Sequence, residues 1–179
     1  MNDSHEILFD EQAIAKKVEE LASRISADYA GKELVLVCIL KGAMIFTADL
    51  MRGLTIPAVI DFVQAASYGD STTSSKTITI KQNIRIDVRD RHVLLVDAII
   101  DTGRTMDQLL RKFGACGPAS LGAVALLDKK SRRVVDVAVA YRGFEIPDAF
   151  VVGYGMDCAE KYRNLPYIAA LKTDQAQGA

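Results

Sequence analysis

The chain has 179 residues, of which 50% are hydrophobic and 25% are charged. Because 22 basic residues nearly balance 23 acidic ones, for a formal net charge of −1, the composition excludes a strong overall field of the kind that attracts nucleic acid or an anionic membrane. The length favours a single domain, residues 1–179, that can bury a core of its own.

The N-terminus reads Met-Asn-Asp-Ser-His-Glu, which is acidic and polar where a signal peptide is basic and then apolar. The longest continuous apolar run, Leu34–Leu40, is far shorter than the roughly 20 residues that a membrane helix needs. These features indicate a cytoplasmic protein without a membrane partner. The three cysteines are scattered, which suits reduced thiols, and the two histidines are too few for a zinc site or a histidine-based triad.

The first predicted element is an amphipathic helix that begins after Asp10, a plausible N-cap, and ends by Gly31. Its apolar residues recur at spacings of three and four: Ile14, Val18, Leu21 and Ile25. The apolar run 34–40 then predicts a buried strand, followed by Lys41-Gly42 and a second helix marked by Met44, Ile45, Ala48 and Leu50. A lysine and a glycine at the end of a buried strand stand where open α/β sheets bind ligands.

A further strand is predicted over 57–63, and the sequence then becomes polar over about 65–81. This segment is too polar to bury and too long for a simple turn. It is either a disordered surface loop or a mobile lid, and the aromatic Tyr68 beside Ser67 slightly favours the lid. Evenly spaced isoleucines predict strands after it: Ile78, Ile80, Ile84 and Ile86.

The stretch 93–106 combines a buried strand with the most polar of the predicted strand ends. Val93–Val96 predicts a strand of a parallel sheet, Asp97 ends the apolar run, and Asp101–Thr105 leads into a helix. Free N–H groups and the dipole at a helix start favour a phosphate, and Gly103 lets the backbone approach it. The alternative is that Asp101 or Thr102 only caps the helix. Acids beside a phosphate site favour a sugar phosphate as ligand.

In the second half, 121–127 predicts another buried strand, followed by a charged cluster from which Lys129 could turn inward. Three valines that alternate with other residues predict one more strand: Val135, Val137 and Val139. Residues 145–157 contain a turn, the aromatic Phe150 and the acid Asp157, and they are followed by the cations Lys161 and Arg163. The chain closes with the apolar segment 167–171 and a polar tail, about 173–179, that is expected to lack fixed structure.

Several stretches, in this order, resemble the purine phosphoribosyltransferases and specifically their hypoxanthine-guanine branch: Leu40–Ala43, Ser67–Gly69, Val93–Thr105, Leu127–Lys129 and residues 146–157. The resemblance implies an α/β type I phosphoribosyltransferase fold, with a mainly parallel central sheet flanked by helices and a small hood from the terminal segments. It also implies an enzyme that joins hypoxanthine or guanine to 5-phosphoribosyl 1-pyrophosphate (PRPP), with Mg²⁺, and releases pyrophosphate and IMP or GMP.

The resemblance also implies roles for individual residues around the sugar. Asp101 would act as general acid or base at purine N7, and it would bind the 5′-phosphate together with Thr102, Gly103, Arg104 and Thr105. Asp97 would bind the ribose, and Asp157 would help hold magnesium.

For the remaining parts of the substrates, the resemblance implies that pyrophosphate is bound by Lys41, Gly42 and Arg163, with a cis peptide at Leu40-Lys41. Phe150 would stack on the purine, Val151 would bind its edge through the backbone, and Lys129 would donate to the 6-oxo group, which disfavours adenine. Ser67 and Tyr68 would belong to the lid. A homodimer or homotetramer is also implied.

The sequence departs from the family pattern at one ribose-binding position. The family carries two adjacent acids, Glu then Asp, where this chain has Asp97 and Ala98. Two functions are therefore considered: a working enzyme with weakened sugar binding, and a regulatory protein on the same fold that senses PRPP or a nucleotide. Asp101, Lys129 and the expected lid favour the enzyme.

Overall fold

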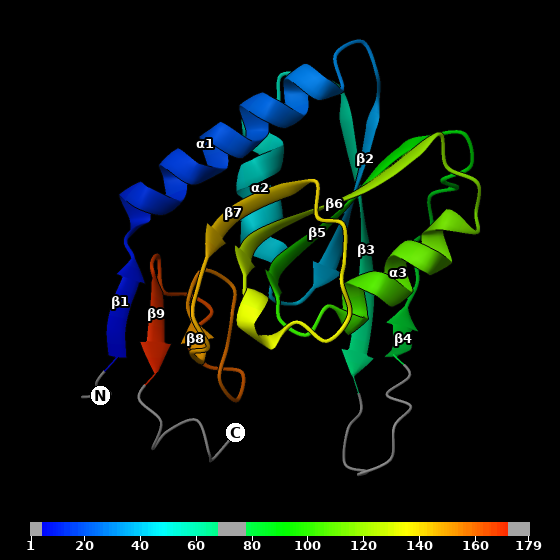
Figure 1. Cartoon of the computed structure of the whole chain (residues 1–179). Helices are drawn as coiled ribbons and strands as arrows, with labels where there is room; N and C mark the ends of the chain where they lie inside the picture. The colour runs from blue at the N-terminus through cyan, green and yellow to red at the C-terminus, as the bar shows by residue number, and fades with distance from the viewer. Residues whose placement is uncertain (1–4, 68–77, 172–179) are drawn as a thin grey trace.

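The computed structural model describes residues 5–67 and 78–171, whose strands form a large and a small sheet (Figure 1). The described elements in chain order are β1 (His5–Phe9), α1 (Glu11–Asp28), β2 (Leu34–Leu40), α2 (Met44–Gly53), β3 (Ala58–Ser67), β4 (Ile78–Gln82), β5 (His92–Ile100), α3 (Arg104–Gly114), β6 (Ser120–Asp128), the 3₁₀ turn η1 (Lys130–Arg132), β7 (Tyr141–Glu145), β8 (Val151–Val152) and β9 (Ile168–Leu171).

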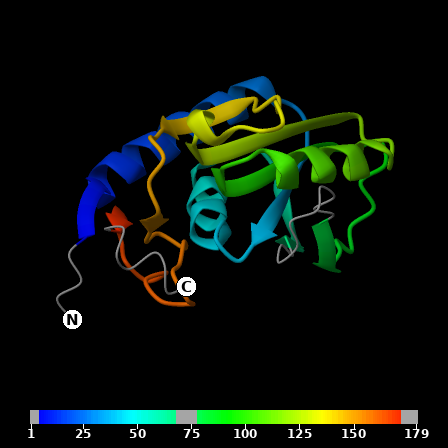
Figure 2. The ribbon, with the colours of Figure 1, turned by 60° about the horizontal axis from the view of Figure 1, so that its bottom comes forward.

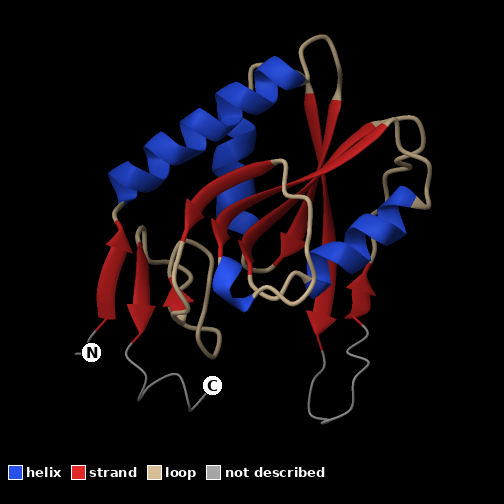
Figure 3. Cartoon of the chain, in the orientation of Figure 1, coloured by secondary structure: helices blue, strands red, loops and turns tan. Residues whose placement is uncertain are grey.

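The large sheet has the strand order β4-β3-β2-β5-β6-β7 (Figure 3). Five neighbouring strands are parallel, in the spatial order β3, β2, β5, β6 and β7. The edge strand β4 pairs antiparallel with β3. The chain builds outward from β2 to β3 on one side and from β5 to β6 and β7 on the other. The boundary between β2 and β5 is therefore the topological switch point, where open α/β sheets bind ligands beyond the carboxyl ends of their strands.

The parallel strands are apolar on both faces because helices cover both. In β2, Leu34, Leu36 and Cys38 face α1 and α2, whereas Val35 and Val37 face α3. Alternate residues of β5 and β6 divide in the same way, so two hydrophobic cores lie on opposite sides of one sheet. Figure 2 shows the ribbon of this sheet and its helices from a second direction. This confirms the predicted mainly parallel sheet flanked by helices.

The two predicted N-terminal helices are confirmed, with corrections at their ends. The Asp10 carboxylate accepts a hydrogen bond from the Ala13 N–H at 2.8 Å, so Asp10 is the N-cap of α1. The helix ends at Asp28, before Gly31, which has a left-handed φ of 74°. In α2 the first predicted core residue, Met44, is 50% exposed, because the buried stripe runs through other positions, chiefly Phe46 and Leu50.

Two strands are longer than predicted. β5 continues through Asp97 to Ile100, because its outer residues still pair with β6, and β3 extends to Ser67, paired with β4. The two ends of the expected lid, 65–67 and 78–81, are therefore strand residues. The tip, which includes Tyr68, lies outside the described residues, so the lid stays a prediction.

The predicted strand at Val135–Val139 is wrong. The N–H groups of Val134 and Val135 donate to the Thr102 carbonyl, each at 3.0 Å, and this prevents them from entering a sheet ladder. Val137 and Val139 are nevertheless buried in the core on the α3 side, so the alternating valines report burial rather than strand structure. The outermost parallel strand is β7, at Tyr141–Glu145.

The small sheet joins the two ends of the chain in the order β1-β9-β8, as the expected hood does. The hood is tied to α2 by the Tyr154 hydroxyl, which donates to Asp49 at 2.6 Å. Burial and this carboxylate both raise the pKa of Tyr154 well above its usual range. Within the described ranges, no helix is both long and apolar enough to cross a membrane, and Cys38, Cys116 and Cys158 are free thiols.

Candidate active site

The phosphate loop, which we define as Asp101–Thr105, connects β5 to α3 at the switch point. Gly103 is the N-cap of α3 with a φ of 83°, and no side chain caps the helix, so the alternative of Asp101 or Thr102 as cap is wrong. A Cβ on Gly103 would lie 2.3 Å from the Val135 carbonyl oxygen, which leaves room for glycine alone. The segment after η1 thus packs directly against the loop at Gly103.

This loop encloses a small hollow of about 90 Å³, lined by Asp97, Ile99, Ile100, Asp101, Thr102, Gly103, Thr105 and Met106. The N–H groups of the first turn of α3 lack intrahelical acceptors, and they carry the positive end of the helix dipole. The threonine hydroxyls are further donors. The hollow therefore offers donors and partial positive charge to an anion, whereas Arg104 of the loop is not among its lining residues.

Asp97 lies in β5 between this hollow and a larger cavity, and it lines both. Burial raises the pKa of its carboxyl to about 7, although hydrogen bonds from the N–H groups of Ala98 and Ile99 act in the opposite direction. Ala98, 2% exposed, also lines the larger cavity, and it brings only a methyl group to the position of the expected second acid.

The larger cavity, of about 290 Å³, gathers side chains from the ends of β2, β5 and β6 and from the segment around β8: Gly42, Asp97, Ala98, Ile99, Asp101, Lys129, Phe150, Val151, Met156 and Asp157. Phe150, which is 39% exposed, is the aromatic residue in the lining of this cavity, and an aromatic ring suits a planar ligand. Most of the residues predicted for ribose and purine binding thus meet in one place.

Lys129 is held at the cavity by the strand ends around it. Its backbone N–H donates to the Ile100 carbonyl at 3.0 Å, which fixes the end of β6 beside the end of β5. The preceding Asp128, 2% exposed, pairs with Arg133 and with Arg142. The Lys129 side chain is itself 8% exposed, so the charged cluster that follows β6 is not uniformly a solvated turn.

The backbone of Val151 has an unpaired side. The Phe150 carbonyl accepts from the Leu171 N–H at 2.9 Å and therefore points at β9. The trans peptide and the pleat then turn the N–H and carbonyl of Val151 to the opposite side of β8, which is the edge of the small sheet. These two groups are available to a ligand in the cavity.

Asp101 lies at the end of a chain of ion pairs. Arg132 Nε is 3.1 Å from Asp101 Oδ1, and Arg132 also pairs with Asp148 Oδ1 at 3.5 Å. The same Asp148 oxygen is 3.9 Å from Lys129 Nζ. The cation predicted for the purine and the acid predicted for proton transfer are therefore linked through Arg132 and Asp148, neither of which was assigned a role from the sequence.

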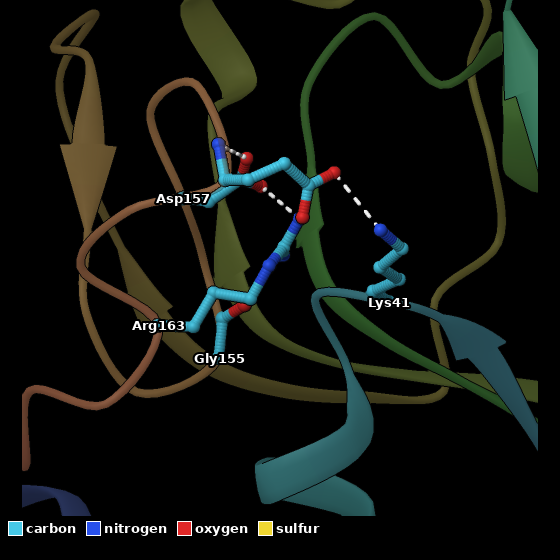
Figure 4. A network of polar contacts seen from close by, with 5 residues as sticks. Lys41, Gly155, Asp157 and Arg163 are labelled. Carbon is cyan, nitrogen blue, oxygen red and sulfur yellow. Dashed lines mark hydrogen bonds and ion pairs between the residues drawn. The ribbon is translucent and has the colours of Figure 1, made fainter.

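A second ionic cluster, which we call the ionic rim, comprises Lys41, Asp157, Glu160 and Arg163 (Figure 4). Lys41 follows the cis peptide at Leu40-Lys41, which is present as expected, and its Nζ is 2.9 Å from Glu160 Oε1. Arg163 is 2.7 Å from Asp157 Oδ1, 3.1 Å from Glu160 Oε2, and 2.8 Å from the Gly155 carbonyl. Lys41 and Arg163 both stand outside the lining of the larger cavity.

The donor set is compatible with magnesium that is mostly bound by substrate. Over the described ranges, no group of three or more His, Cys, Asp or Glu side chains could hold a metal by itself. Magnesium usually keeps several waters and uses one or two carboxylates plus substrate phosphates. Asp157, whose side chain is 30% exposed and lines the larger cavity, fits such a ligand.

Of the residues that line or border the candidate site, Glu160 had the weakest sequence signal. It lies in a charged stretch near the C-terminus with no spacing that sets it apart, and only the fold brings it to Lys41, 119 positions away. Arg132 was likewise hidden among other charged residues, whereas Asp148 lies in the stretch 146–157 that carries the resemblance but was assigned no role there. For Ser67, the structure describes only the backbone, which forms the last residue of β3.

Comparisons with known proteins agree with this geometry. The phosphoribosyl transferase domain family matches residues 4–159. A hypoxanthine-guanine phosphoribosyltransferase of Streptococcus pneumoniae is 43% identical over 173 residues, 97% of this chain and 96% of that protein. A hypoxanthine phosphoribosyltransferase of Salmonella typhimurium is 42% identical, over 94% of this chain and 96% of that protein. A crystal structure of a hypoxanthine-guanine phosphoribosyltransferase from Bacillus anthracis matches with a TM-score of 0.90 and 42% identity, over 93% of this chain and 98% of that one.

Proposed function

The chain belongs to the phosphoribosyl transferase domain family, and on this premise we propose that it is a purine-salvage hypoxanthine-guanine phosphoribosyltransferase. It transfers the phosphoribosyl group of PRPP to hypoxanthine or guanine. The bond between ribose C1′ and the pyrophosphate oxygen breaks, and a bond between C1′ and the purine forms. The products are IMP or GMP and pyrophosphate.

The observation that supports this proposal best is the convergence of Asp101, Lys129, Phe150 and Val151 on one cavity beside the phosphate loop. Phe150 supplies a stacking surface worth about 1–3 kcal/mol for any base. The Lys129 ammonium can only donate, so it complements the 6-oxo group and opposes the 6-amino group of adenine. The Val151 N–H and carbonyl, which point away from β9, would bind the edge of the same purine.

Proton transfer is assigned to Asp101. When the purine nitrogen attacks C1′, the purine must lose the proton at N7, and the Asp101 carboxylate takes it. To do so it exchanges its ion pair with Arg132, which is exposed enough to swing away. General base catalysis of this kind contributes roughly 10²–10⁴-fold.

The remaining residues hold PRPP. The phosphate loop binds the 5′-phosphate, Asp97 accepts hydrogen bonds from ribose hydroxyls, and Lys41, Gly42 and Arg163 face the pyrophosphate. Magnesium, held by Asp157 and substrate oxygens, would neutralise charge on the leaving pyrophosphate. A lid carrying Ser67 and Tyr68 would exclude water that otherwise hydrolyses the activated sugar.

The regulatory alternative is not favoured, since the relatives that cover nearly the whole chain are named as enzymes. We also infer a homodimer or homotetramer from the family resemblance, which light scattering of the purified chain tests directly.

The test is a magnesium-dependent assay of PRPP with hypoxanthine, guanine, xanthine and adenine, in which nucleotide and pyrophosphate are both measured. We expect turnover with hypoxanthine or guanine, equal amounts of the two products, and little turnover with adenine. Binding of PRPP without turnover of any base would contradict the proposal and support a sensor.

A further inference from the structure

The Glu160 carboxylate forms ion pairs with Lys41 and Arg163, the two cations that are proposed to bind pyrophosphate. One carboxylate oxygen lies 2.9 Å from Lys41 Nζ and the other lies 3.1 Å from an Arg163 nitrogen, so each oxygen pairs with one cation. The carboxylate therefore bridges the loop after β2 and the segment after β8, as a diphosphate would. Both cations lower the pKa of Glu160, which keeps the bridge charged.

The backbone holds Glu160 in an uncommon conformation at this position. Ala159 and Glu160 have φ values of 49° and 64°, and they form the tip of a turn that is closed by paired hydrogen bonds between Cys158 and Lys161. Positive φ at both central residues is a type I′ pattern that favours Gly and Asn. The Glu160 N–H is held by Asp157 Oδ2 at 2.9 Å. A charged residue is thus fixed where sterics favour a smaller one.

We propose that Glu160 is a built-in competitor of the diphosphate: it holds Lys41 and Arg163 in the ligand-free chain and is displaced when the diphosphate of PRPP, or product pyrophosphate, binds. This inference rests on the proposed function for the place of pyrophosphate. A diphosphate carries more negative charge and more acceptor oxygens than a carboxylate, so the exchange is favourable. The lost ion pairs nevertheless lower the net affinity.

The competition is weak enough to permit turnover, because the partners are accessible to water. The side chains of Lys41 and Glu160 are 53% and 65% exposed, and exposed ion pairs contribute little. Arg163 is held more firmly, since it also contacts Asp157 and the Gly155 carbonyl, so its guanidinium stays in place when Glu160 leaves.

The test compares full-length wild type with Glu160→Gln, which keeps size and removes charge. We expect the Kd for magnesium pyrophosphate by calorimetry, and the KM for PRPP, to fall by roughly two- to tenfold. The gain shrinks as ionic strength rises, because salt screens exposed charges. Glu20→Gln is the matched control, since Glu20 is an exposed glutamate paired with Lys17 at 2.6 Å on α1, and it leaves both constants unchanged.

An unchanged Kd, or weaker binding of magnesium pyrophosphate by Glu160→Gln, would overturn the inference, the latter because it would mean that Glu160 organises the site instead of competing for it. The proposed function fails separately, if wild type shows no turnover of PRPP with any purine. Calorimetry with magnesium pyrophosphate does not depend on turnover. The two failures are therefore distinguishable.

Discussion

The phosphate loop and the ionic rim are built in opposite ways. The loop is one contiguous segment between β5 and α3, shaped by the backbone of Gly103 and by the Thr102 carbonyl that holds the segment after η1. The rim joins residues 119 positions apart through exposed side-chain ion pairs. A backbone site has little freedom to adjust, whereas an ionic site can exchange partners. The first suits a group that stays bound through the reaction, and the second suits one that leaves.

The largest expected effect comes from the acid that begins the loop. Asp101→Asn keeps the shape of the side chain and removes its ability to accept a proton, so we expect kcat with hypoxanthine to fall by roughly 10²–10⁴-fold. Asp107→Asn, on α3 with Arg111 as its partner at 3.0 Å, is the matched control and keeps wild-type turnover. If Asp101→Asn turned over normally, the acid-base role of the loop would be wrong.

A methyl group at Gly103 tests whether the loop is rigid. Gly103→Ala places a Cβ against the Val135 carbonyl and keeps a strained φ, so we expect the KM for PRPP to rise on the order of 100-fold through misplacement of the 5′-phosphate. Gly31→Ala has a similar φ but open space around the Cβ, so it isolates the strain from the clash. Equal KM values in the two variants would show that the loop adapts, and the contrast with the rim would disappear.

Lys129 combines features of the two regions. Its backbone is fixed by a hydrogen bond, as in the phosphate loop, whereas its proposed contact with the purine is made by a charged side chain, as in the ionic rim. Lys129→Met removes the donor for the 6-oxo group, which costs about 1–3 kcal/mol, and kcat/KM for hypoxanthine is expected to fall roughly tenfold. Lys130→Met removes the neighbouring exposed charge, paired with Glu145 at 2.5 Å, and leaves kcat/KM unchanged. Unaltered kinetics of Lys129→Met with hypoxanthine, guanine and adenine would remove it as the specificity residue.

The smallest effect is expected from pH. In the proposed ribose contact, the ionised form of Asp97, whose carboxyl pKa is raised to about 7, accepts more strongly from the ribose hydroxyls than the neutral form does. The KM for PRPP is therefore expected to fall roughly threefold from about pH 6 to about pH 8. Asp97→Asn measures the part of the profile that belongs to PRPP itself, and a profile identical to wild type would exclude Asp97.

The same raised pKa affects stability. An unfolded aspartate ionises near pH 4 and the folded Asp97 near 7. The folded chain therefore binds more protons between these values, so the contribution of Asp97 to the free energy of unfolding decreases as pH rises through this window. Thermal unfolding of wild type and Asp97→Asn should converge below about pH 4.

The buried strands and the helices between them could be read from the sequence, because apolar periodicity records burial directly. The same reasoning failed for Val135–Val139, because Val137 and Val139 are buried outside any strand and the N–H groups of Val134 and Val135 donate to the Thr102 carbonyl. It also ended β5 too early at Asp97, since one polar residue does not interrupt a ladder of backbone hydrogen bonds. The pattern of apolar side chains indicates which residues are buried. Whether those residues form a strand depends on which neighbouring backbone groups are available for hydrogen bonds.

By itself, the sequence determined the phosphate loop, because a strand, a glycine and a helix start suffice to form it from contiguous residues. Through the family resemblance, it also predicted roles for Lys129, Phe150 and Asp157. Only the tertiary structure decided that Glu160 reaches Lys41 and Arg163, and that Arg132 and Asp148 connect Asp101 to Lys129. Backbone geometry is set by neighbours in the chain, whereas ion pairs between long side chains depend on distances that exist only after the strands have assembled in their order.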